Sequence, residues 1–438
     1  MRSKAIHFIS SVLLLTTLFV TQTSSSVAHA LVSVQAQTSI GSQHVVALGS
    51  NGTVWTWGSL IPGPTGVGSK DALASPTQVV LPADRTAVDV AATYNASFAV
   101  ANDGTVWAWG TLGRGLGDTA VTTDARYVSP VQVAIPGGVS IAEVSAACEG
   151  VMARASNGDV YQWGYFYGNW QMSYTTPTKV AGVANATSIS RGCSTSFAVA
   201  ANGSAYAWGS NGGGRLGDGT TTDRLSPVTI SLPNSKTFTR ISTSSSHALA
   251  MASDGSLYGW GGNSNGQLGA DPNAVAYSAT PRAISIGSTT AVAISTTDTT
   301  PFSIVVTSAN TVLKWGGWSS SEYVPSAMTL PTSDLSTRTL VDVSTYQNAA
   351  IFVANDNSLW AKGGWSSVDL DGNCGANAVD YPMWINGVTM PARSLVRTVS
   401  KGQFGPAFTE DQFSIAKMET ASGSPLPLDG SGTTVAAM

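Results

Sequence analysis

The sequence predicts an all-β fold, a single β-propeller with seven blades, or eight as the alternative. Three observations support this prediction. A strand–turn–strand phrase ending in Trp-Gly recurs along the chain, its period averages about 51 residues, and further short strands flank every copy. A period of this size indicates a solenoid or a propeller, and four strands per unit are typical of a propeller blade.

The composition excludes several other classes of protein. Only 11% of the 438 residues are charged, against about 25% in ordinary globular chains, and 46 residues are glycine. Low charge with abundant glycine argues against coiled coils, helical bundles and charged disorder. The formal net charge of −4 provides no basic surface, so no nucleic-acid partner is expected.

The recurring phrase is a β-hairpin. Residues Asn51–Gly58 read Asn-Gly-Thr-Val-Trp-Thr-Trp-Gly, and Asp103–Gly110 repeat them with two changes. Asn-Gly or Asp-Gly between two β-forming runs is the strongest short hairpin signal, because both turn residues need positive φ. The later copies end at Gly164, Gly209, Gly261, Gly316 and Gly363.

Each hairpin is expected to belong to a four-stranded sheet. A strand headed by proline follows it, as at Pro76–Val79, and a short strand such as Ala87–Val90 precedes the next hairpin. Proline at the start or edge of a strand loses no ladder hydrogen bond. One such sheet cannot bury both faces, so neighbouring sheets must cover them and the ring must close. The recurring tryptophans are therefore expected to pack blade against blade; they are Trp57, Trp109, Trp163, Trp208, Trp260 and Trp315.

The ends of the chain lie outside this repeat pattern. Arg2 and Lys4 precede an apolar run from Phe8 to Val20, and Ala28-His29-Ala30 forms a signal-peptidase pattern. We expect residues 1–30 to be a signal peptide cleaved after Ala30, with export to the medium or cell envelope and no later membrane span. The propeller then occupies residues 31–419, and residues 420–438 form a flexible tail rich in Gly, Ser and Pro.

Two glycine-rich loops carry a resemblance to a known family. Asn211–Gly219 reads Asn-Gly-Gly-Gly-Arg-Leu-Gly-Asp-Gly, and Asn263–Gly269 ends in Gly-Gln-Leu-Gly. With the Trp-Gly strands, they resemble the regulator of chromosome condensation repeat, here in a secreted, bacterial member. The resemblance implies a β-propeller of usually seven blades, and its best-known activity is guanine nucleotide exchange.

The chain also departs from this family pattern. Only His44 and His247 keep the strand histidine, and the glycine-rich loop is missing from four units. A degenerate extra hairpin at Val399–Lys417 either closes the ring against the N-terminal strands or makes an eighth blade; we prefer seven blades.

No catalytic motif stands out, so we expect no enzymatic activity and no cofactor. His44 and His247 both fill a repeat slot, which favours a structural role over the base of a Ser-His-Asp site. A weak calcium-loop candidate has oxygen ligands at Asp369, Asp371, Asn373 and Asp380, but Cys374 replaces the required glycine. A plain rim loop is the preferred interpretation there, and no metal is expected.

Two cysteines share one repeat slot. Cys148 and Cys193 each lie ten residues before the turn glycine of adjacent units. Equivalent positions of neighbouring blades could lie within disulfide reach, and export would permit the bond. Two separate buried thiols are the alternative, and Cys374 is left over.

Aromatic residues follow the Trp-Gly strand where the glycine-rich loop is missing. They are Tyr165, Phe166, Tyr167 and Trp170 in the third unit, Trp318 in the sixth and Trp365 in the seventh. All should emerge on one rim, where they form a binding patch or fold over the rim and fill space.

These features predict a monomeric, exported, non-enzymatic scaffold that binds a protein through its rim loops. The alternatives are a lectin or enzyme acting on a cell-surface glycan and, by family resemblance alone, an exchange-factor-like protein. A propeller glycosidase would need two carboxylates about 5 to 9.5 Å apart, and the sequence singles out no such pair.

Overall fold

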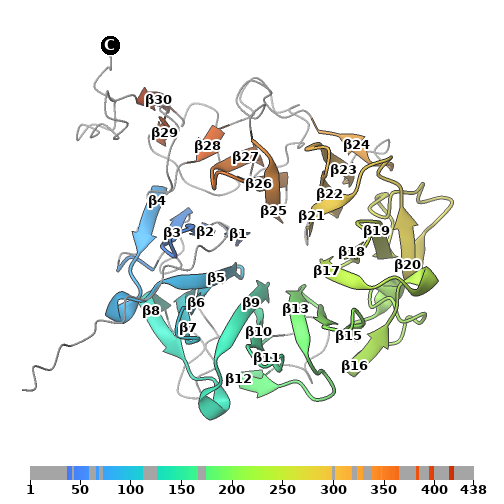
Figure 1. Ribbon diagram of the computed structural model, residues 1–438, viewed down its shortest axis with the longest axis horizontal. Helices are drawn as coiled ribbons and strands as arrows, with labels where there is room; N and C mark the ends of the chain where they lie inside the picture. The colour runs from blue at the N-terminus through green and yellow to red at the C-terminus, as the bar shows by residue number, and fades with distance from the viewer. Residues whose placement is uncertain are drawn as a thin grey trace, which may run out of the picture. The chain divides into compact units, whose positions relative to one another are not determined.

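The fold is a seven-bladed β-propeller (Figure 1), as the sequence predicts. A computed structural model describes residues 37–41, 44–58, 66–68, 73–111, 126–165, 174–297, 301–317, 323–328, 338–346, 348–364, 381–383, 394–398 and 414–418. The chain divides into two units, Met1–Val32 and Ser33–Met438, and the propeller lies in the second. No helix in these described ranges is long and apolar enough to cross a membrane.

Each blade is one contiguous stretch of chain folded into four antiparallel strands. Blades 1 to 4 contain β1 (Gln37–Ile40), β2 (His44–Leu48), β3 (Val54–Gly58) and β4 (Leu73–Val79); β5 (Ala87–Ala92), β6 (Ala96–Ala101), β7 (Val106–Thr111) and β8 (Arg126–Val133); β9 (Ile141–Ala147), β10 (Gly150–Ala155), β11 (Val160–Gly164) and β12 (Tyr174–Lys179); and β13 (Ala186–Arg191), β14 (Thr195–Ala200), β15 (Ala205–Gly209) and β16 (Arg224–Ile230).

The remaining blades follow the same order. Blades 5 to 7 contain β17 (Phe238–Thr243), β18 (His247–Ala252), β19 (Leu257–Gly262) and β20 (Tyr277–Ile284); β21 (Ala291–Thr296), β22 (Phe302–Thr307), β23 (Val312–Gly316) and β24 (Ser326–Ala327); and β25 (Leu340–Tyr346), β26 (Asn348–Ala354), β27 (Leu359–Gly364) and β28 (Tyr381–Met383). Single 3₁₀ turns lie in the connections between blades, except η4, which lies between β15 and β16 of blade 4. They are η1 (Pro82–Asp84), η2 (Pro136–Gly138), η4 (Gly212–Gly214) and η5 (Pro233–Ser235).

The hairpin turns differ from the predicted geometry in one respect: in the Asn-Gly and Asp-Gly copies the glycine has positive φ, but the Asn or Asp before it does not. Gly104 has φ +79°, and a Cβ there would collide with Ser140. The Asp103 carboxylate accepts the backbone N–H of Thr105 at 3.0 Å, and the Thr105 hydroxyl accepts Trp107 Nε1–H at 2.8 Å. The turn residues therefore fix both the reversal of the chain and the orientation of the first aromatic residue of the strand.

The proline strands begin earlier than the sequence suggests. We expected Pro76 and Pro130 to head their strands, but β4 starts at Leu73 and β8 at Arg126. In blade 1 the register between β3 and β4 shifts between Thr56 and Gly58, opposite this proline segment. Proline fits inside the strand because β4 is an edge strand with an irregular register, where its missing N–H breaks no regular ladder.

The tryptophans of the Trp-Gly strands pack between blades, as predicted. Trp109, Trp163, Trp208, Trp260 and Trp315 are the largest fully buried side chains. Trp163 of blade 3 meets Phe98 of blade 2 edge-to-face at 6.3 Å, and Trp260 of blade 5 meets Phe197 of blade 4 at 5.8 Å. Each tryptophan thus covers the exposed face of the preceding sheet, which a single blade cannot bury alone.

Blades 7 and 1 close the ring without sharing a strand. Ile40, Trp55 and Trp57 of blade 1 form one apolar cluster with Tyr346 and Ile351 of blade 7. The Thr38 hydroxyl also donates to the Ser344 hydroxyl at 3.1 Å, across 306 residues of chain. Apolar packing and hydrogen bonds between the first strands of these blades therefore hold the ring together.

The extra C-terminal hairpin is not an eighth blade. It is a two-stranded sheet of β29 (Ser394–Thr398) and β30 (Ser414–Met418), close to the predicted Val399–Lys417. β29 contacts β28 of blade 7 and β4 of blade 1, so the hairpin lies outside the junction where the ring closes (Figure 1).

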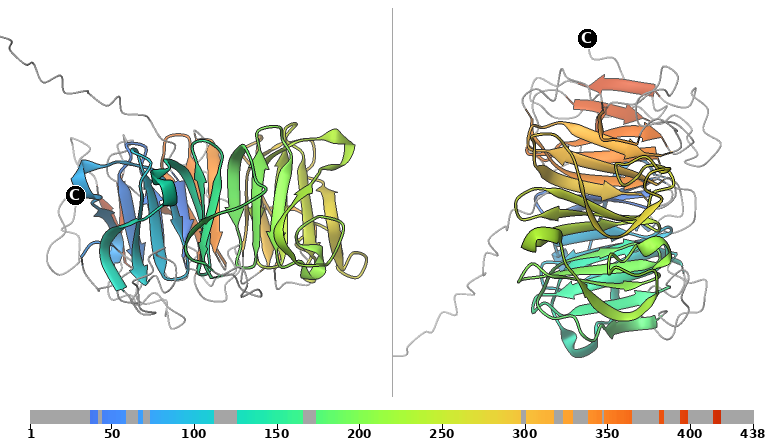
Figure 2. Two further views of the ribbon diagram at one scale, coloured as in Figure 1. Left: turned by 90° about the horizontal axis from the view of Figure 1, so that it is seen from below. Right: turned by 90° about the vertical axis from the view of Figure 1, so that its right-hand side faces the viewer.

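The strands run roughly along the ring axis, so their connections lie at its two ends (Figure 2). One end, which we name the turn face, carries the Asn-Gly and Asp-Gly hairpin turns. The other, the loop face, carries the turns after the first strands and the loops after the Trp-Gly strands. Tyr165, the described member of the predicted rim aromatics, directly follows β11 and so lies at the loop face.

Candidate functional site: the central channel

The first strand of every blade lines a cavity on the propeller axis. β1, β5, β9, β13, β17, β21 and β25 surround this axis (Figure 1), and their residues line a cavity of about 540 Å³. The first strands of blades 2 to 6 share one register, since equivalent residues such as Ala87, Ile141 and Phe238 donate their N–H to the carbonyl of the turn glycine of the preceding blade. In blade 7 the N–H of Leu340 donates to Asn310 Oδ1, at the same turn position. Side chains at equivalent positions therefore form tiers around the channel.

The fifth position of these strands forms a serine tier. It is serine in every blade except blade 2, where Ala91 replaces it: Ser39, Ser145, Ser190, Ser242, Ser295 and Ser344. Ser39 Oγ accepts the N–H of Ala92 at 2.9 Å, and Ser145 Oγ accepts that of Arg191 at 3.0 Å. The serine tier thus ties the first strand of one blade to that of the next.

The third position forms most of a charged tier. Asp89, Glu143, Arg240 and Asp342 occupy it, and Arg154 reaches in from β10. Arg154 Nε lies 2.7 Å from Glu143 Oε2. Arg240 Nη1 lies 3.1 Å from Asp342 Oδ1, two blades away, with small Ala293 at the intervening position.

Asp89 differs from the other carboxylates of the charged tier. It is 8% exposed, and its Oδ2 accepts the N–H of Val144 at 2.6 Å. Burial, reinforced by the negative charge of Glu143, raises the pKa of the Asp89 carboxyl well above its usual range. In the described part of the chain no basic side chain forms an ion pair with Asp89.

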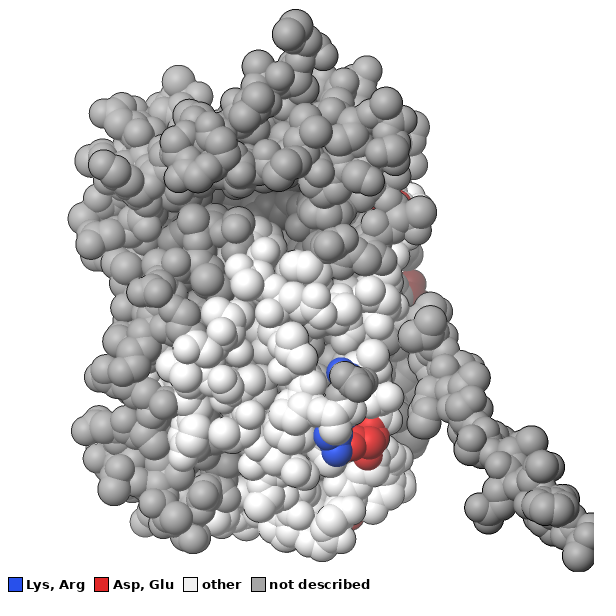
Figure 3. Space-filling view, turned by 90° about the vertical axis from the view of Figure 1, so that its left-hand side faces the viewer, with Lys and Arg blue, Asp and Glu red and all other residues white. Residues whose placement is uncertain are grey.

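By comparison, charge is sparse on the described surface of the one side of the propeller that Figure 3 draws. Figure 3 shows the side that carries β4 and β8, where few Lys, Arg, Asp or Glu side chains appear on the described surface. In a chain with only 11% charged residues, the tier of five charges in the channel is therefore a local concentration.

Both repeat-slot histidines are sealed between blades. His44 and His247 are fully buried, and their Nε2 atoms lie 2.9 Å from Ser97 Oγ and Ser303 Oγ of the following blades. Burial lowers the pKa of His44 to about 4 and that of His247 to about 3. Neither imidazole lines the channel, so each serves as a neutral inter-blade hydrogen-bonding group.

This burial predicts a loss of stability in mild acid. Below the ordinary histidine pKa of 6.5 the unfolded chain binds protons that the folded chain does not, so the free energy of unfolding falls as pH drops from 6.5 towards 4. At pH 5 each histidine is expected to cost about 2 kcal/mol relative to pH 7.5. Urea unfolding of wild type and of a His247→Gln variant checks this, since the variant should lose about half of the histidine-dependent change.

Asp89 contributes to the pH dependence of stability with the opposite sign. Its contribution is the same in wild type and His247→Gln, so it cancels when the two chains are compared. Because its pKa is raised, its protonation stabilises the folded chain as pH falls. Identical pH dependence of wild type and His247→Gln between pH 7.5 and 5 would contradict the role given to His247.

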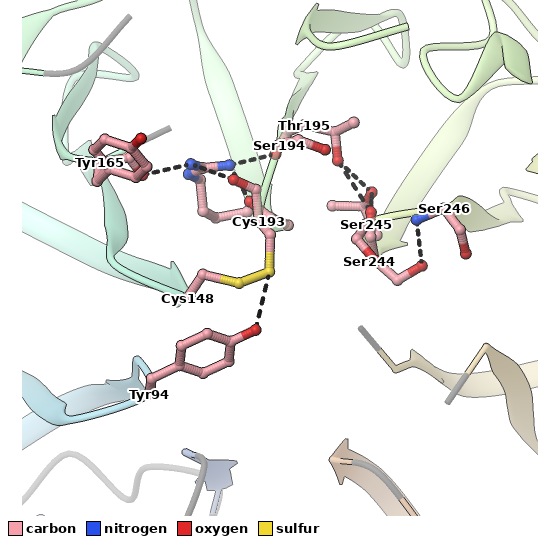
Figure 4. The surroundings of a disulfide bond; sticks show 12 residues. Tyr94, Cys148, Tyr165, Cys193, Ser194, Thr195, Ser244, Ser245 and Ser246 are labelled. Atoms are coloured by element: carbon pink, nitrogen blue, oxygen red, sulfur yellow. Dashed lines mark hydrogen bonds between the residues drawn. A yellow bond between two sulfur atoms is a disulfide. The ribbon is translucent and has the colours of Figure 1, made fainter. Parts of the chain in front are cut away.

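Cys148 and Cys193 are joined in a disulfide between blades 3 and 4 (Figure 4), with Cα atoms 5.1 Å apart. They lie in the turns after β9 and β13, the shared slot that suggested the pairing. The Tyr94 hydroxyl of blade 2 approaches Cys193 Sγ at 3.8 Å. Close to the disulfide, Arg191 donates to the carbonyls of Thr195 at 2.8 Å and Tyr165 at 3.3 Å.

The glycine-rich loops connect neighbouring blades through hydrogen bonds. Asn211 Nδ2 donates to Asp218 Oδ1 at 2.9 Å, and its Oδ1 accepts the N–H of Leu216, which is fully buried. The carbonyl of Arg215 then accepts Trp260 Nε1–H of the next blade at 3.0 Å. The loop resembling the known family therefore stabilises the blade 4–blade 5 contact in this chain.

Most predicted rim residues lie outside the described residues. Tyr165 is described, half-buried at the end of β11, with its carbonyl held by Arg191. Phe166, Tyr167, Trp170, Trp318 and Trp365 are not, and neither are the calcium-loop candidates Asp369, Asp371, Asn373 and Asp380 or the third cysteine, Cys374. Among the described residues no group of His, Cys, Asp and Glu is arranged to hold a metal ion.

Sequence reasoning missed both tiers of the channel. The sequence predicts a short strand at Ala87–Val90, but its positions were not compared with those of the equivalent strands in other blades. The signal was present: once the first strands are aligned on the turn glycines, a serine recurs at the fifth position with the period of the blades.

Two family models match the repeats. Both are described as the regulator of chromosome condensation (RCC1) repeat; one matches residues 202–251 and 254–298, the other residues 36–59 and 238–267. Among curated proteins, the chain is similar to the ultraviolet-B receptor UVR8 of Arabidopsis thaliana, with 29% identity over 264 residues. That match covers 58% of each chain, so it spans less than two thirds of the receptor.

Solved structures share the fold. Prp20p from Saccharomyces cerevisiae superposes with a TM-score of 0.59 at 19% identity, covering 70% of this chain and 79% of that one. Human WBSCR16 gives a TM-score of 0.62 at 17% identity, covering 77% and 95%. At these identities the likeness concerns the fold alone.

Proposed function

Because RCC1 repeat models match parts of the chain, we propose that it is an exported, non-enzymatic scaffold that binds a protein partner through its loop face. The propeller provides a rigid ring, and its connections can vary without disturbing the blades. A protein of the same fold supports protein binding in general, since Prp20p is described as binding Gsp1p and histones.

One observation carries the non-enzymatic part of the proposal. His44 and His247, the histidines most available as a catalytic base in the exported chain, are fully buried and hydrogen-bonded to serines of the next blade. With their pKa values lowered to about 4 and 3, they are neutral at pH 7 and out of reach of a substrate.

Export is supported by the N-terminal pattern and by the disulfide. Residues 1–30 carry the charge, apolar run and Ala-His-Ala pattern of a signal peptide, and disulfides persist in oxidising compartments. N-terminal sequencing of the protein recovered from culture medium should begin at Leu31. Recovery only from the cytoplasm with Met1 retained would contradict export.

The partner is to be sought by capture from the secretome and cell wall of the source cell with the purified chain. We expect a Trp318→Ala/Trp365→Ala variant to lose at least ten-fold in partner affinity while its melting temperature stays within about 3 °C of wild type. Tyr277→Ala, at an exposed position on β20, is the matched control. Unchanged affinity with a large fall in melting temperature would show that these tryptophans fill space.

A glycan-binding protein is the second candidate, favoured by the serines and carboxylates that line the channel. A glycan array followed by a reducing-sugar assay separates binding from turnover. Exchange-factor-like activity is the alternative implied by the family, and stimulated GDP release from a small GTPase would reveal it.

A further inference from the structure

The charged tier of the channel is one positive charge short. Among the described residues, Asp89, Glu143 and Asp342 share this level with two arginines, Arg154 and Arg240. Those two arginines are engaged by Glu143 and Asp342 at 2.7 and 3.1 Å. A third arginine, Arg191, lines the cavity one residue beyond the serine tier and donates to the backbone carbonyls of Cys193 and Thr195.

Asp89 is therefore the carboxylate of the tier with which no described arginine forms an ion pair, although the charge of Arg154 acts on it through space. It is more than nine-tenths buried, lines the cavity and accepts the Val144 N–H at Oδ2. A buried carboxylate without a counter-ion is costly, and its raised pKa reflects that cost. A cation brought beside Asp89 would stabilise its charged form and neutralise the tier.

The serine tier lies one step along the same strands. Two residues of β-strand separate the tiers, a rise of about 7 Å. Ser39 and Ser145 each accept a backbone N–H, and a hydroxyl that accepts still has a proton to donate. These hydroxyls can donate to ligand hydroxyl oxygens without releasing the neighbouring blade.

The cavity is also the right size for such a ligand. Its volume of about 540 Å³ lies within the range of about 300–1,000 Å³ typical of small-molecule sites. The tiers supply charge at one level and hydroxyl groups at the other, which suits a molecule that carries an ammonium group on a polyol frame.

We propose that the channel binds an amino sugar, with its ammonium group against Asp89 and its hydroxyl groups against the serine tier. This inference rests on the proposed binding function and names a ligand class for it. The amino sugar is either free or the terminal unit of a surface polysaccharide, because both present the same cation and hydroxyls.

Calorimetric titration of the purified chain at pH 7 tests the proposal with glucosamine, N-acetylglucosamine, glucose and putrescine. Glucosamine should bind at least ten-fold more tightly than N-acetylglucosamine or glucose, which lack the cation, and than putrescine, which lacks the hydroxyls. A glucosamine oligomer distinguishes the sources: binding tighter than the monomer indicates a polysaccharide end, and weaker binding indicates the free sugar.

Asp89→Asn should weaken glucosamine binding at least ten-fold, since the amide oxygen can keep the Val144 hydrogen bond but carries no charge. Asp103→Asn, on the exposed turn face, is the matched control and should bind like wild type. Thermal melting verifies that both variants fold. If Asp89→Asn is poorly folded, Asp89→Glu replaces it in the test: this variant restores the charge and should recover part of the affinity for glucosamine.

Equal affinity for glucosamine and N-acetylglucosamine, no binding of either, or undiminished binding by Asp89→Asn would overturn the proposal. Putrescine binding as tightly as glucosamine would contradict the role of the serine tier and overturn it as well. Capture of a protein partner by Asp89→Asn at wild-type level, with no sugar binding by wild type, would leave the scaffold function standing and remove this inference alone.

Discussion

Replacing Trp260 by alanine is expected to destabilise the propeller by about 3–5 kcal/mol. Its indole is fully buried between blades 4 and 5, edge-to-face with Phe197 at 5.8 Å and Phe238 at 6.2 Å. Its Nε1–H donates to the carbonyl of Arg215 at 3.0 Å. Alanine would leave a cavity at the blade interface and remove the donor that holds the glycine-rich loop.

Urea unfolding of the purified chain measures this loss. Trp260→Phe keeps most of the apolar volume and should cost clearly less than Trp260→Ala. Tyr277→Ala, at a position 52% exposed on β20, should change stability by less than about 0.5 kcal/mol. A Trp260→Ala chain as stable as Tyr277→Ala would be incompatible with tryptophan packing as the contact between blades.

Removing the disulfide is expected to cost about 4 kcal/mol of unfolding free energy, from the loop entropy released when cysteines 45 residues apart are no longer linked. The bond joins blades 3 and 4 near the channel, where the Tyr94 hydroxyl approaches Cys193 (Figure 4). Arg191 also donates to the carbonyl of Cys193. Unfolding of a Cys148→Ser/Cys193→Ser variant, compared with wild type under oxidising conditions, measures the effect.

Reductant gives an independent measurement of the same bond. Dithiothreitol should lower the stability of wild type towards that of the double variant and leave the double variant unchanged. Cys374→Ser is the control for the remaining thiol and should respond to reductant as wild type does. A wild-type chain that is equally stable with and without reductant, and matches the double variant, would exclude a stabilising disulfide.

Features encoded within one repeat could be predicted from the sequence. The Asn-Gly and Asp-Gly turns, the tryptophan slots and the shared cysteine slot each recur at a fixed distance from a turn glycine. These features predicted the blade count, the blade-to-blade packing and the cysteine pairing seen in the structure. The predicted start of the proline strands was wrong, because strand pairing continues on both sides of the proline across a shift in register.

Features made by several blades together could not be predicted in the same way. The contact between Arg240 and Asp342 spans 102 residues and depends on the small side chain of Ala293 between them. No local pattern encodes such a contact, since it exists only after the ring has closed. The charge deficit at Asp89 likewise becomes visible only when acids and bases from several blades are counted at one level of the channel.

Closure of the ring between blades 1 and 7 is the claim on which the channel and the shared loop face depend. A Thr38→Cys/Ser344→Cys variant tests it, because these hydroxyls are 3.1 Å apart across 306 residues and their replacements would lie within disulfide reach. Peptide mapping without reductant should find the two introduced thiols linked to each other within single monomeric chains. Free thiols at both positions, or links only between different chains, would contradict a closed propeller.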